Sequence, residues 1–246
     1  MAQRKSAALV QTIPNLVTCI GLSCGLISIF MSMAGNYAQA AWFIALCVLL
    51  DKLDGTTARL LNAGSEIGVQ LDSLSDFVTF TVAPAMLYVA ILTQQGTVFS
   101  TMPRSLLIYT SAVVYVIAGA ARLARFNCEA QDGGIQRFFQ GIPTTVVGAF
   151  AAMFYLVISK YVPLDSYAAA LPPLLLLLAI SMVCGLYLPK LGKTGSKMVN
   201  LFFVLNTPTV IGCVVFQLCP EYLLSILVIY LSVGLIWANR KGVEIS

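Results

Sequence analysis

The sequence predicts an all-α protein, a polytopic transmembrane helix bundle of about eight transmembrane helices with both termini cytoplasmic. Three observations support this fold class. Hydrophobic residues make up 59% and charged residues only 10% of the 246 residues, whereas about a quarter of residues are charged in a soluble domain. The mean hydropathy is +0.90. Apolar stretches of spanning length recur along the chain, and basic residues gather in the links on one side of them.

Eight apolar stretches of roughly 20 residues make up the predicted bundle. The first begins where Pro14 and Asn15 interrupt the apolar run, and its length favours a retained helix over a cleaved signal peptide. Prolines such as Pro84 and Pro208 are expected to be kinks, which neighbouring helices tolerate within a bundle. In chain order the stretches run approximately over 15–34, 38–61, 71–93, 105–126, 142–160, 168–188, 198–218 and 222–239.

Short polar or glycine- and proline-containing links separate these stretches. GNYAQ follows the first stretch, TQQGTVFSTMPR follows the third, and EAQDGGIQRFFQ follows the fourth. None of the links is long enough to hold a soluble domain, and the chain has no evident internal repeat. We therefore expect a single membrane-embedded domain over residues 1–246.

The basic residues orient the bundle. With the N-terminus inside and eight crossings, only Arg104 and Lys160 fall on the outer side. This asymmetry is a strong positive-inside signal, and adding or removing one crossing would scatter the charges over both faces. The residues on the cytoplasmic side are Arg4, Lys5, Lys52, Arg59, Arg122, Arg125, Arg137, Lys190, Lys193, Lys197, Arg240 and Lys241.

The residue types that are missing exclude several kinds of enzyme. The chain has no histidine, which excludes Ser-His-Asp triads and histidine-ligated zinc sites. Its seven cysteines lie mostly within apolar runs and form no C-x-x-C pair. We interpret them as small core residues rather than as a disulfide framework.

Four aspartates stand out because they fall at the ends of two predicted membrane helices. Asp51 and Asp54 lie near the cytoplasmic end of the second stretch, and Asp72 and Asp76 lie at the start of the third. Spacings of three and four residues put each pair on one helix face. Two antiparallel neighbouring helices can therefore direct four carboxylates at one point.

Four carboxylates near a membrane interior require positive charge. Each costs about 2.5–3.5 kcal/mol at a helix centre on insertion scales, and like charges in contact add to that cost. Lys52 and Arg59 supply only two charges, whereas two divalent cations neutralise all four carboxylates. Oxygen ligands favour magnesium, manganese or calcium. Two such ions can clamp a phosphoryl group during attack by an alcohol, although intramembrane carboxylates also occur in cation transporters.

Small and basic residues surround the predicted cation site. Gly55, Ala58 and Gly68 keep side-chain bulk away from the aspartates, so that a ligand can approach the backbone. Arg59 can pair with a phosphate at the cytoplasmic end of its helix. Arg122, Arg125 and Lys190, from other stretches, can do the same, which indicates an anionic substrate.

These residues carry a resemblance to a known family. The pattern Asp51-x-x-Asp54-Gly55-x-x-Ala58-Arg59, followed after eight residues by Gly68-x-x-x-Asp72-x-x-x-Asp76, resembles the signature of the CDP-alcohol phosphotransferases at every fixed position. The resemblance implies an integral membrane enzyme that binds a CDP-linked alcohol, uses two divalent cations and displaces CMP with a hydroxyl group. It also implies that the four aspartates hold the metal ions, that Asp76 is the catalytic base, and that Gly55, Ala58 and Arg59 surround the diphosphate.

Four further segments resemble one branch of that family, the integral-membrane phosphatidylserine synthases. They are PNLVT at 14–18, SDFVTFTVAPA at 75–85, ARLARFN at 121–127 and FFQGIP at 138–143. The resemblance implies transfer of the phosphatidyl group from CDP-diacylglycerol to the hydroxyl of L-serine. Glycerol phosphate, inositol phosphate and choline remain alternative acceptors, and a cation transporter remains a third interpretation.

The same resemblance assigns substrate-binding residues and partners. It implies that CDP-diacylglycerol binds at Asn15, Thr18, Gly55, Ala58, Arg59 and Gly68. Serine carries an ammonium and a carboxylate group, so we expect basic or amide side chains to bind the acceptor or its phosphate, and the candidates are Arg122, Arg125, Asn127 and Lys190. The lipid bilayer and a second copy of the chain are the expected partners, without nucleic acid. We expect the protein in a bacterial cytoplasmic membrane, with the active site facing the cytoplasm.

Overall fold

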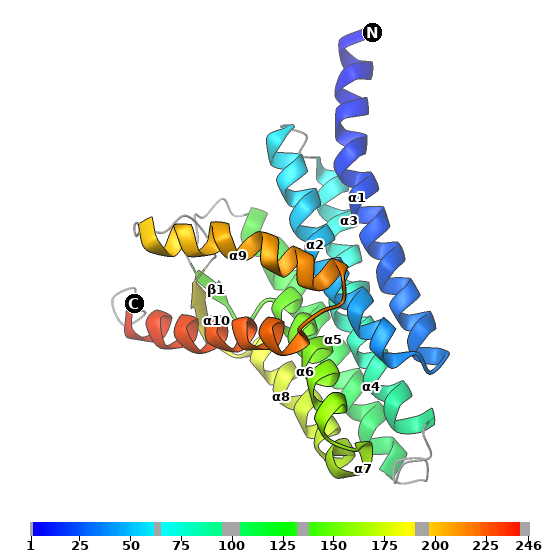
Figure 1. The fold of residues 1–246 in the computed structure, drawn as a ribbon. Coiled ribbons are helices and arrows are strands. Elements are labelled where there is room, and N and C mark those ends of the chain that lie inside the picture. The colour runs from blue at the N-terminus through cyan, green and yellow to red at the C-terminus, as the bar shows by residue number, and fades with distance from the viewer. Residues whose placement is uncertain (1, 62–64, 95–103, 132–137, 190–196, 242–246) are drawn as a thin grey trace.

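Helices follow the apolar stretches of the sequence in the structure, a computed structural model that describes residues 2–61, 65–94, 104–131, 138–189 and 197–241 (Figure 1). The all-α fold class is confirmed, with one short pair of strands added to it. In chain order the elements are α1 Ala2–Met33, α2 Tyr37–Leu60, α3 Glu66–Asp76, the π-helix η1 Phe77–Val82, α4 Ala83–Gln94, α5 Arg104–Gln131, β1 Phe138–Gln140, α6 Thr144–Tyr161, α7 Leu164–Tyr167, the 3₁₀-helix η3 Ala168–Ala170, α8 Leu171–Val183, β2 Tyr187–Pro189, α9 Lys197–Val215 and α10 Pro220–Lys241.

Five helical segments of the described chain are long and apolar enough to cross a membrane. The chain is therefore a polytopic helical membrane protein. α2 has 24 residues but carries four charged residues, Asp51, Lys52, Asp54 and Arg59. Membrane crossing by α2, α9 and α10, and the cytoplasmic position of both termini, stay predictions. The five segments are Thr12–Met33, Glu66–Thr93, Ser105–Glu129, Thr144–Tyr161 and Leu164–Val183.

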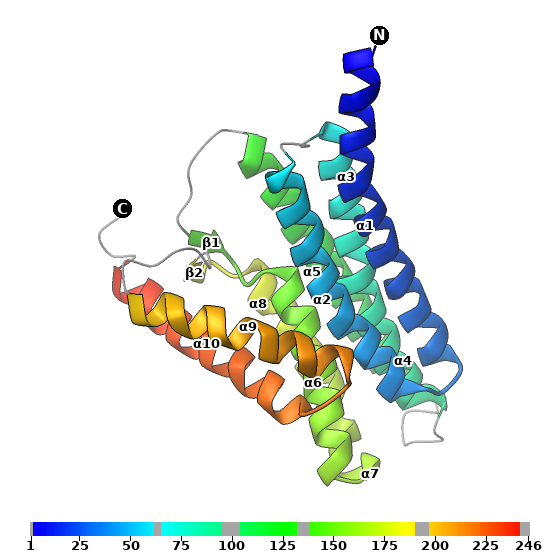
Figure 2. The ribbon, with the colours of Figure 1, turned by 45° about the horizontal axis from the view of Figure 1, so that its top comes forward.

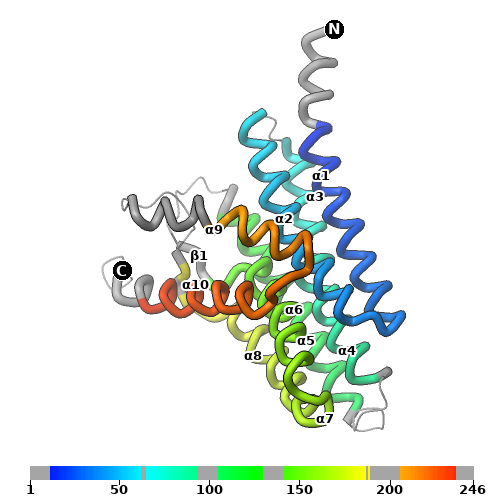
Figure 3. Tube along the Cα trace, viewed as in Figure 1, coloured from blue at the N-terminus to red at the C-terminus, as the bar shows by residue number. Residues whose placement is uncertain are grey.

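The first helices place the acidic segment at one end of the bundle. α1 packs along α2 and α3, and the three run side by side in both ribbon views (Figures 1 and 2). The C-terminal end of α2 and the N-terminal end of α3 lie at the same end of the bundle (Figure 3). α9 and α10 lie on another flank, where α9 contacts α2 and α10 contacts α6.

The π-helix η1 continues α3 into α4 and is enclosed by three other helices. The Ala83 N–H donates a hydrogen bond to the carbonyl of Val78, five residues earlier. This spacing is that of a π-helix, whose turn is wider than that of an α-helix. Glycines allow the close packing: a Cβ at Gly25 of α1 would lie 2.5 Å from Thr79 Cγ2, and one at Gly148 of α6 would lie 2.8 Å from Phe80 Cα. η1 is therefore fixed from several sides.

Tyr115 of α5 completes the enclosure of η1. Its side chain is fully buried, and its hydroxyl donates a hydrogen bond of 3.0 Å to the carbonyl of Phe80. A π-helix shifts backbone hydrogen bonds out of the α-helical register, so a side-chain donor at this carbonyl helps to hold the unusual turn. The segment directly after Asp76 is thus held by both packing and hydrogen bonding.

The two strands differ from the sequence prediction. The predicted sixth membrane stretch, 168–188, ends as a helix at Val183, and Tyr187–Pro189 instead pairs antiparallel with Phe138–Gln140. The Gly141 N–H donates a hydrogen bond of 2.7 Å to the Leu186 carbonyl. The backbone angle φ of Gly141 is +79°, a conformation that favours glycine over other residues. Backbone pairing between distant segments replaces the helical hydrogen bonds here, so hydropathy alone does not reveal it.

Candidate active site

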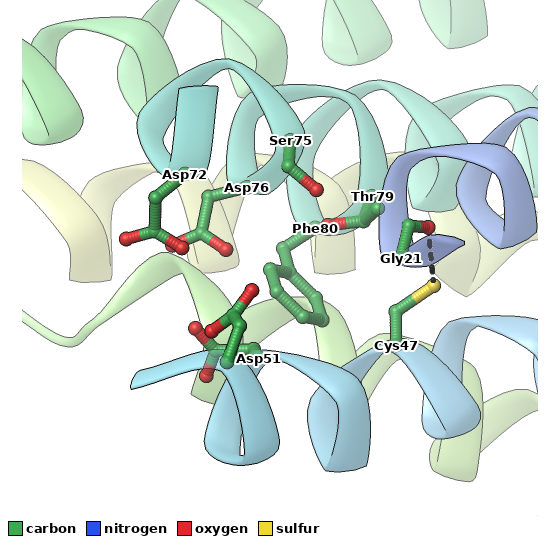
Figure 4. Close-up of a pocket in the computed structure, with 9 residues that line it drawn as sticks. Gly21, Cys47, Asp51, Asp72, Ser75, Asp76, Thr79 and Phe80 are labelled. Atoms are coloured by element: carbon green, nitrogen blue, oxygen red, sulfur yellow. Dashed lines mark hydrogen bonds between the residues drawn. The ribbon is translucent and has the colours of Figure 1, made fainter. Parts of the chain in front are cut away.

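Three of the predicted aspartates converge between α2 and α3. Asp51, Asp72 and Asp76 can each place a carboxylate oxygen within 4.8 Å of the others. Asp72 and Asp76 lie four residues apart on α3 and face Asp51 across the gap (Figure 4). All three are half-buried. The helix spacing that predicted a shared face therefore does bring these carboxylates together.

Asp54 lies in the same cavity but outside this group of three. Its side chain is only 6% exposed, and the Thr18 side chain lies beside its carboxylate. Residues from α1, α2, α3 and η1 enclose a space of about 190 Å³, including the part open to solvent. They are Gly21, Cys47, Asp51, Asp54, Asp72, Ser75, Asp76, Thr79 and Phe80.

No basic side chain neutralises these carboxylates by a close ion pair in the described part of the chain. The ion pair found there joins Lys160 to Glu221, at 2.6 Å, on α6 and α10. Lys52 and Arg59 are exposed. A concave set of carboxylate oxygens without a protein counter-charge has the composition that hard divalent cations prefer. The residues present therefore fit a divalent metal site.

Hydrogen bonds fix the helices that carry the aspartates. The Ser75 hydroxyl donates a hydrogen bond of 3.4 Å to the Thr18 carbonyl, and the Cys47 thiol lies 3.5 Å from the Gly21 carbonyl. At the start of α3, the Ser65 side chain accepts a hydrogen bond of 3.0 Å from the Gly68 N–H, and this bond caps the helix. The first two contacts join α3 and α2 to α1, and the third stabilises the start of α3.

The residues expected to bind the nucleotide lie around the ends of these helices. A Cβ at Gly68 would stand 3.0 Å from Asn15 Oδ1, so Asn15 and Gly68 are adjacent. None of the described residues comes within 4 Å of the Cβ position at Gly55, which leaves its backbone open to a ligand. Ala58 is half-buried and Arg59 is exposed.

The residues expected to bind the acceptor are spread more widely. Arg122 is only 5% exposed and stacks over the Phe126 ring at 5.6 Å. Arg125 is half-buried, and neither arginine lines the cavity. The Asn127 side-chain amide donates a hydrogen bond of 2.9 Å to the hydroxyl of Ser73, the residue next to Asp72. Lys190 lies outside the described residues.

Sequence reasoning missed the inner wall of the cavity. Ser75, Thr79 and Phe80 line it beyond the carboxylates, on the side of Gly21 and Cys47 (Figure 4). Ser75 and Thr79 stand three and seven residues after Asp72, which is the spacing of one helix face. That periodicity was the available signal, although the π-turn that adjusts the direction of Thr79 has no signature in the sequence.

Comparison with known proteins adds a family match. Residues 11–188 match the family model described as CDP-alcohol phosphatidyltransferase. A Helicobacter pylori protein named CDP-diacylglycerol–serine O-phosphatidyltransferase is 32% identical over 184 residues, which cover 73% of each chain. Proteins of the same name are 38% identical in Bacillus subtilis (48% of this chain, 62% of the relative) and 39% identical in Saccharomyces cerevisiae (50% and 44%).

Proposed function

We propose that this chain, which belongs to the CDP-alcohol phosphatidyltransferase family, transfers the phosphatidyl group from CDP-diacylglycerol to the hydroxyl of L-serine. The products are phosphatidylserine and CMP. The observation that carries this proposal is the convergence of Asp51, Asp72 and Asp76 within the segment that matches the family model. The names of the similar proteins support serine as the acceptor.

The aspartates would hold two divalent cations, Mg²⁺ or Mn²⁺, and Ca²⁺ can occupy the same oxygen ligands. Asp51, Asp72 and Asp76 are the nearest group, and Asp54 borders the same cavity. When bound, such ions supply positive charge that polarises the diphosphate and stabilises the charge that develops on it.

Asp76 is the proposed base. Its carboxylate takes the proton of the serine hydroxyl, the serine oxygen bonds to the lipid-bearing phosphorus, and the bond from that phosphorus to the CMP oxygen breaks. The electron pair of the broken bond stays on CMP, which leaves. Positioning and electrostatic stabilisation supply most of the rate enhancement in reactions of this type.

Other residues would bind the substrates around this centre. Gly55, Ala58 and Gly68 would leave room for the nucleotide, with Asn15, Thr18 and Arg59 as its polar contacts. The acceptor or its phosphate would be held by Arg122, Arg125, Asn127 and Lys190. The Asn127–Ser73 hydrogen bond supports a place for Asn127 next to Asp72.

The setting of the enzyme is also proposed. The protein is an integral membrane protein, and the distribution of Lys and Arg supports an active site that faces the cytoplasm of a bacterial cell. Residues 1–246 would form one membrane-embedded domain. The family resemblance supports a homodimer.

A comparison of acceptors tests the proposal. Membranes that contain the protein are supplied with CDP-diacylglycerol, Mn²⁺ and one labelled alcohol at a time: L-serine, glycerol phosphate, inositol phosphate or choline. We expect CMP release and labelled lipid with serine alone. Preferential labelling with another alcohol would identify a sibling activity. If no alcohol gave CMP release, the aspartate cluster would have to serve another purpose, such as cation transport.

A further inference from the structure

The hydroxyl of Thr79 is unusual among the helical hydroxyl groups of this chain. Thr18, Thr57 and Thr93 each donate a hydrogen bond to the carbonyl four residues earlier, which is the ordinary arrangement for threonine in a helix. The Thr79 side chain is only 1% exposed, yet its Oγ1 has no hydrogen-bond partner among the described residues. A buried hydroxyl without a partner is destabilising.

Packing fixes the direction of this hydroxyl. The Thr79 methyl group, Cγ2, lies against α1 where Gly25 has no side chain, 2.5 Å from the place that a Cβ would occupy. Threonine is β-branched, and its rotamer is stiff. With the methyl group seated on Gly25, the hydroxyl group must take another position, and Thr79 is one of the residues that line the aspartate cavity.

The cavity continues inward from the carboxylates toward Thr79. In Figure 4 the Phe80 ring lies between the carboxylates and Cys47, with Ser75 and Thr79 along the same wall. Asp76 and Thr79 both line this cavity, three residues apart along the continuous α3–η1 helix. No cationic side chain lines this inner end within the described ranges.

In-line displacement at phosphorus indicates which substrate occupies the inner end. The attacking and leaving oxygens stand on opposite sides of the phosphorus. Most of the proposed nucleotide residues lie toward the helix ends: Gly55, Ala58 and Arg59 follow Asp54 on α2, and Gly68 precedes Asp72 on α3, whereas Asn15 and Thr18 lie on α1. The attacking oxygen should therefore come from the opposite, inner side, where Asp76 and Thr79 lie.

We propose that the Thr79 hydroxyl binds the attacking hydroxyl group of the acceptor, a small uncharged CH₂OH group, and holds it beside Asp76. Thr79 donates a hydrogen bond to the acceptor oxygen. One lone pair of that oxygen is then used by Thr79, another attacks phosphorus, and the proton passes to Asp76. The P–O bond to CMP breaks with its electron pair on CMP. This inference rests on the proposed function and adds a contact for the acceptor within the same site.

Three variants test the inference. Thr79→Val keeps the shape of the side chain and removes the hydroxyl, whereas Thr79→Ser keeps the hydroxyl. Thr81→Val is the matched control, because Thr81 is equally buried in η1, its Oγ1 also lacks a partner within the described chain, and it packs on Gly119 rather than lining the cavity. Initial rates are measured with CDP-diacylglycerol, Mn²⁺ and L-serine, and CMP binding is measured separately.

We expect Thr79→Val to lower kcat/KM for serine about tenfold, as expected for one lost hydrogen bond. The KM for CDP-diacylglycerol and the affinity for CMP should stay unchanged. Thr79→Ser should retain more activity than Thr79→Val, and Thr81→Val should match the unaltered chain. Should Thr79→Val fail to insert into membranes, Thr79→Ala removes the same hydroxyl without added bulk.

Normal serine kinetics in Thr79→Val, or in Thr79→Ala where the valine variant does not insert, would overturn the inference. Equal losses in Thr79→Val and Thr81→Val, or weaker CMP binding by Thr79→Val alone, would also overturn it, because the hydroxyl would then act through the fold or the nucleotide. The unaltered chain is assayed first. Its failure to release CMP with any alcohol would contradict the proposed function itself, which is a different result.

Discussion

The contact between Gly148 and the π-helix gives the sharpest prediction about the fold that supports the site. A Cβ at position 148 would lie 2.8 Å from both the Cα and the carbonyl oxygen of Phe80. These are backbone atoms, which cannot rotate away as the end of a side chain can. Gly148→Ala must therefore separate α6 from η1, and it must displace Phe80 from the cavity wall.

The magnitude follows from two opposing effects. Overpacking of a core costs about 1–3 kcal/mol, and contact with backbone atoms places this substitution toward the upper end. Alanine in place of glycine within a helix contributes about 1 kcal/mol of stability. We expect Gly148→Ala to lower the free energy of unfolding by about 1–2 kcal/mol. CMP release should also fall, because Phe80 borders the carboxylates.

Gly212→Ala is the matched control for this experiment. Gly212 lies within α9, and no atom of the described part of the chain stands within 4 Å of its Cβ position. This variant should be as stable as the unaltered chain or more stable. Thermal denaturation of both variants in one detergent, followed by circular dichroism, measures the difference. Equal midpoints for Gly148→Ala and Gly212→Ala would refute the close packing of α6 on η1.

Three other substitutions test the site and its support. Asp76→Asn should lower CMP release at least about 100-fold while the chain still inserts, as expected for loss of a general base; near-normal release would remove the base assignment. Arg59→Ala should raise the KM for CDP-diacylglycerol about tenfold, through loss of a charged phosphate contact, with little change in thermal stability; an unchanged KM would contradict that role. Tyr115→Phe removes the donor to the Phe80 carbonyl and should destabilise the protein by about 1–3 kcal/mol. The exposed Tyr109 on the same helix provides the control Tyr109→Phe, which should have no effect.

The sequence was most informative where local spacing decides the geometry. Helix periodicity placed Asp72 and Asp76 on one face, and the structure brings both to Asp51. Periodicity alone also grouped Asp54 with Asp51, but the Asp54 carboxylate lies beside the Thr18 side chain of α1 and outside the closest group. This contact joins two helices that are distant in the sequence, which hydropathy does not encode.

The parts that the sequence did not reveal depend on distant segments. The strand pair joins Phe139 to Leu188, and the apolar character of 184–188 resembles the helix that precedes it. The π-turn after Asp76 depends on close packing against Gly25 and Gly148. Thr79 acquires its position from this turn, so its place in the cavity could not be predicted from residue spacing alone.

Binding of Mn²⁺ to the purified protein in the presence of CDP is the measurement that tests the central claim most directly. The number of ions bound per chain can be determined by electron paramagnetic resonance of the free ion. We predict two bound ions per chain for the unaltered protein and fewer than two for Asp51→Asn. The control variant Asp165→Asn, which changes an exposed aspartate in α7, should also bind two ions. Equal binding by Asp51→Asn and the unaltered chain would contradict a metal centre built on these carboxylates.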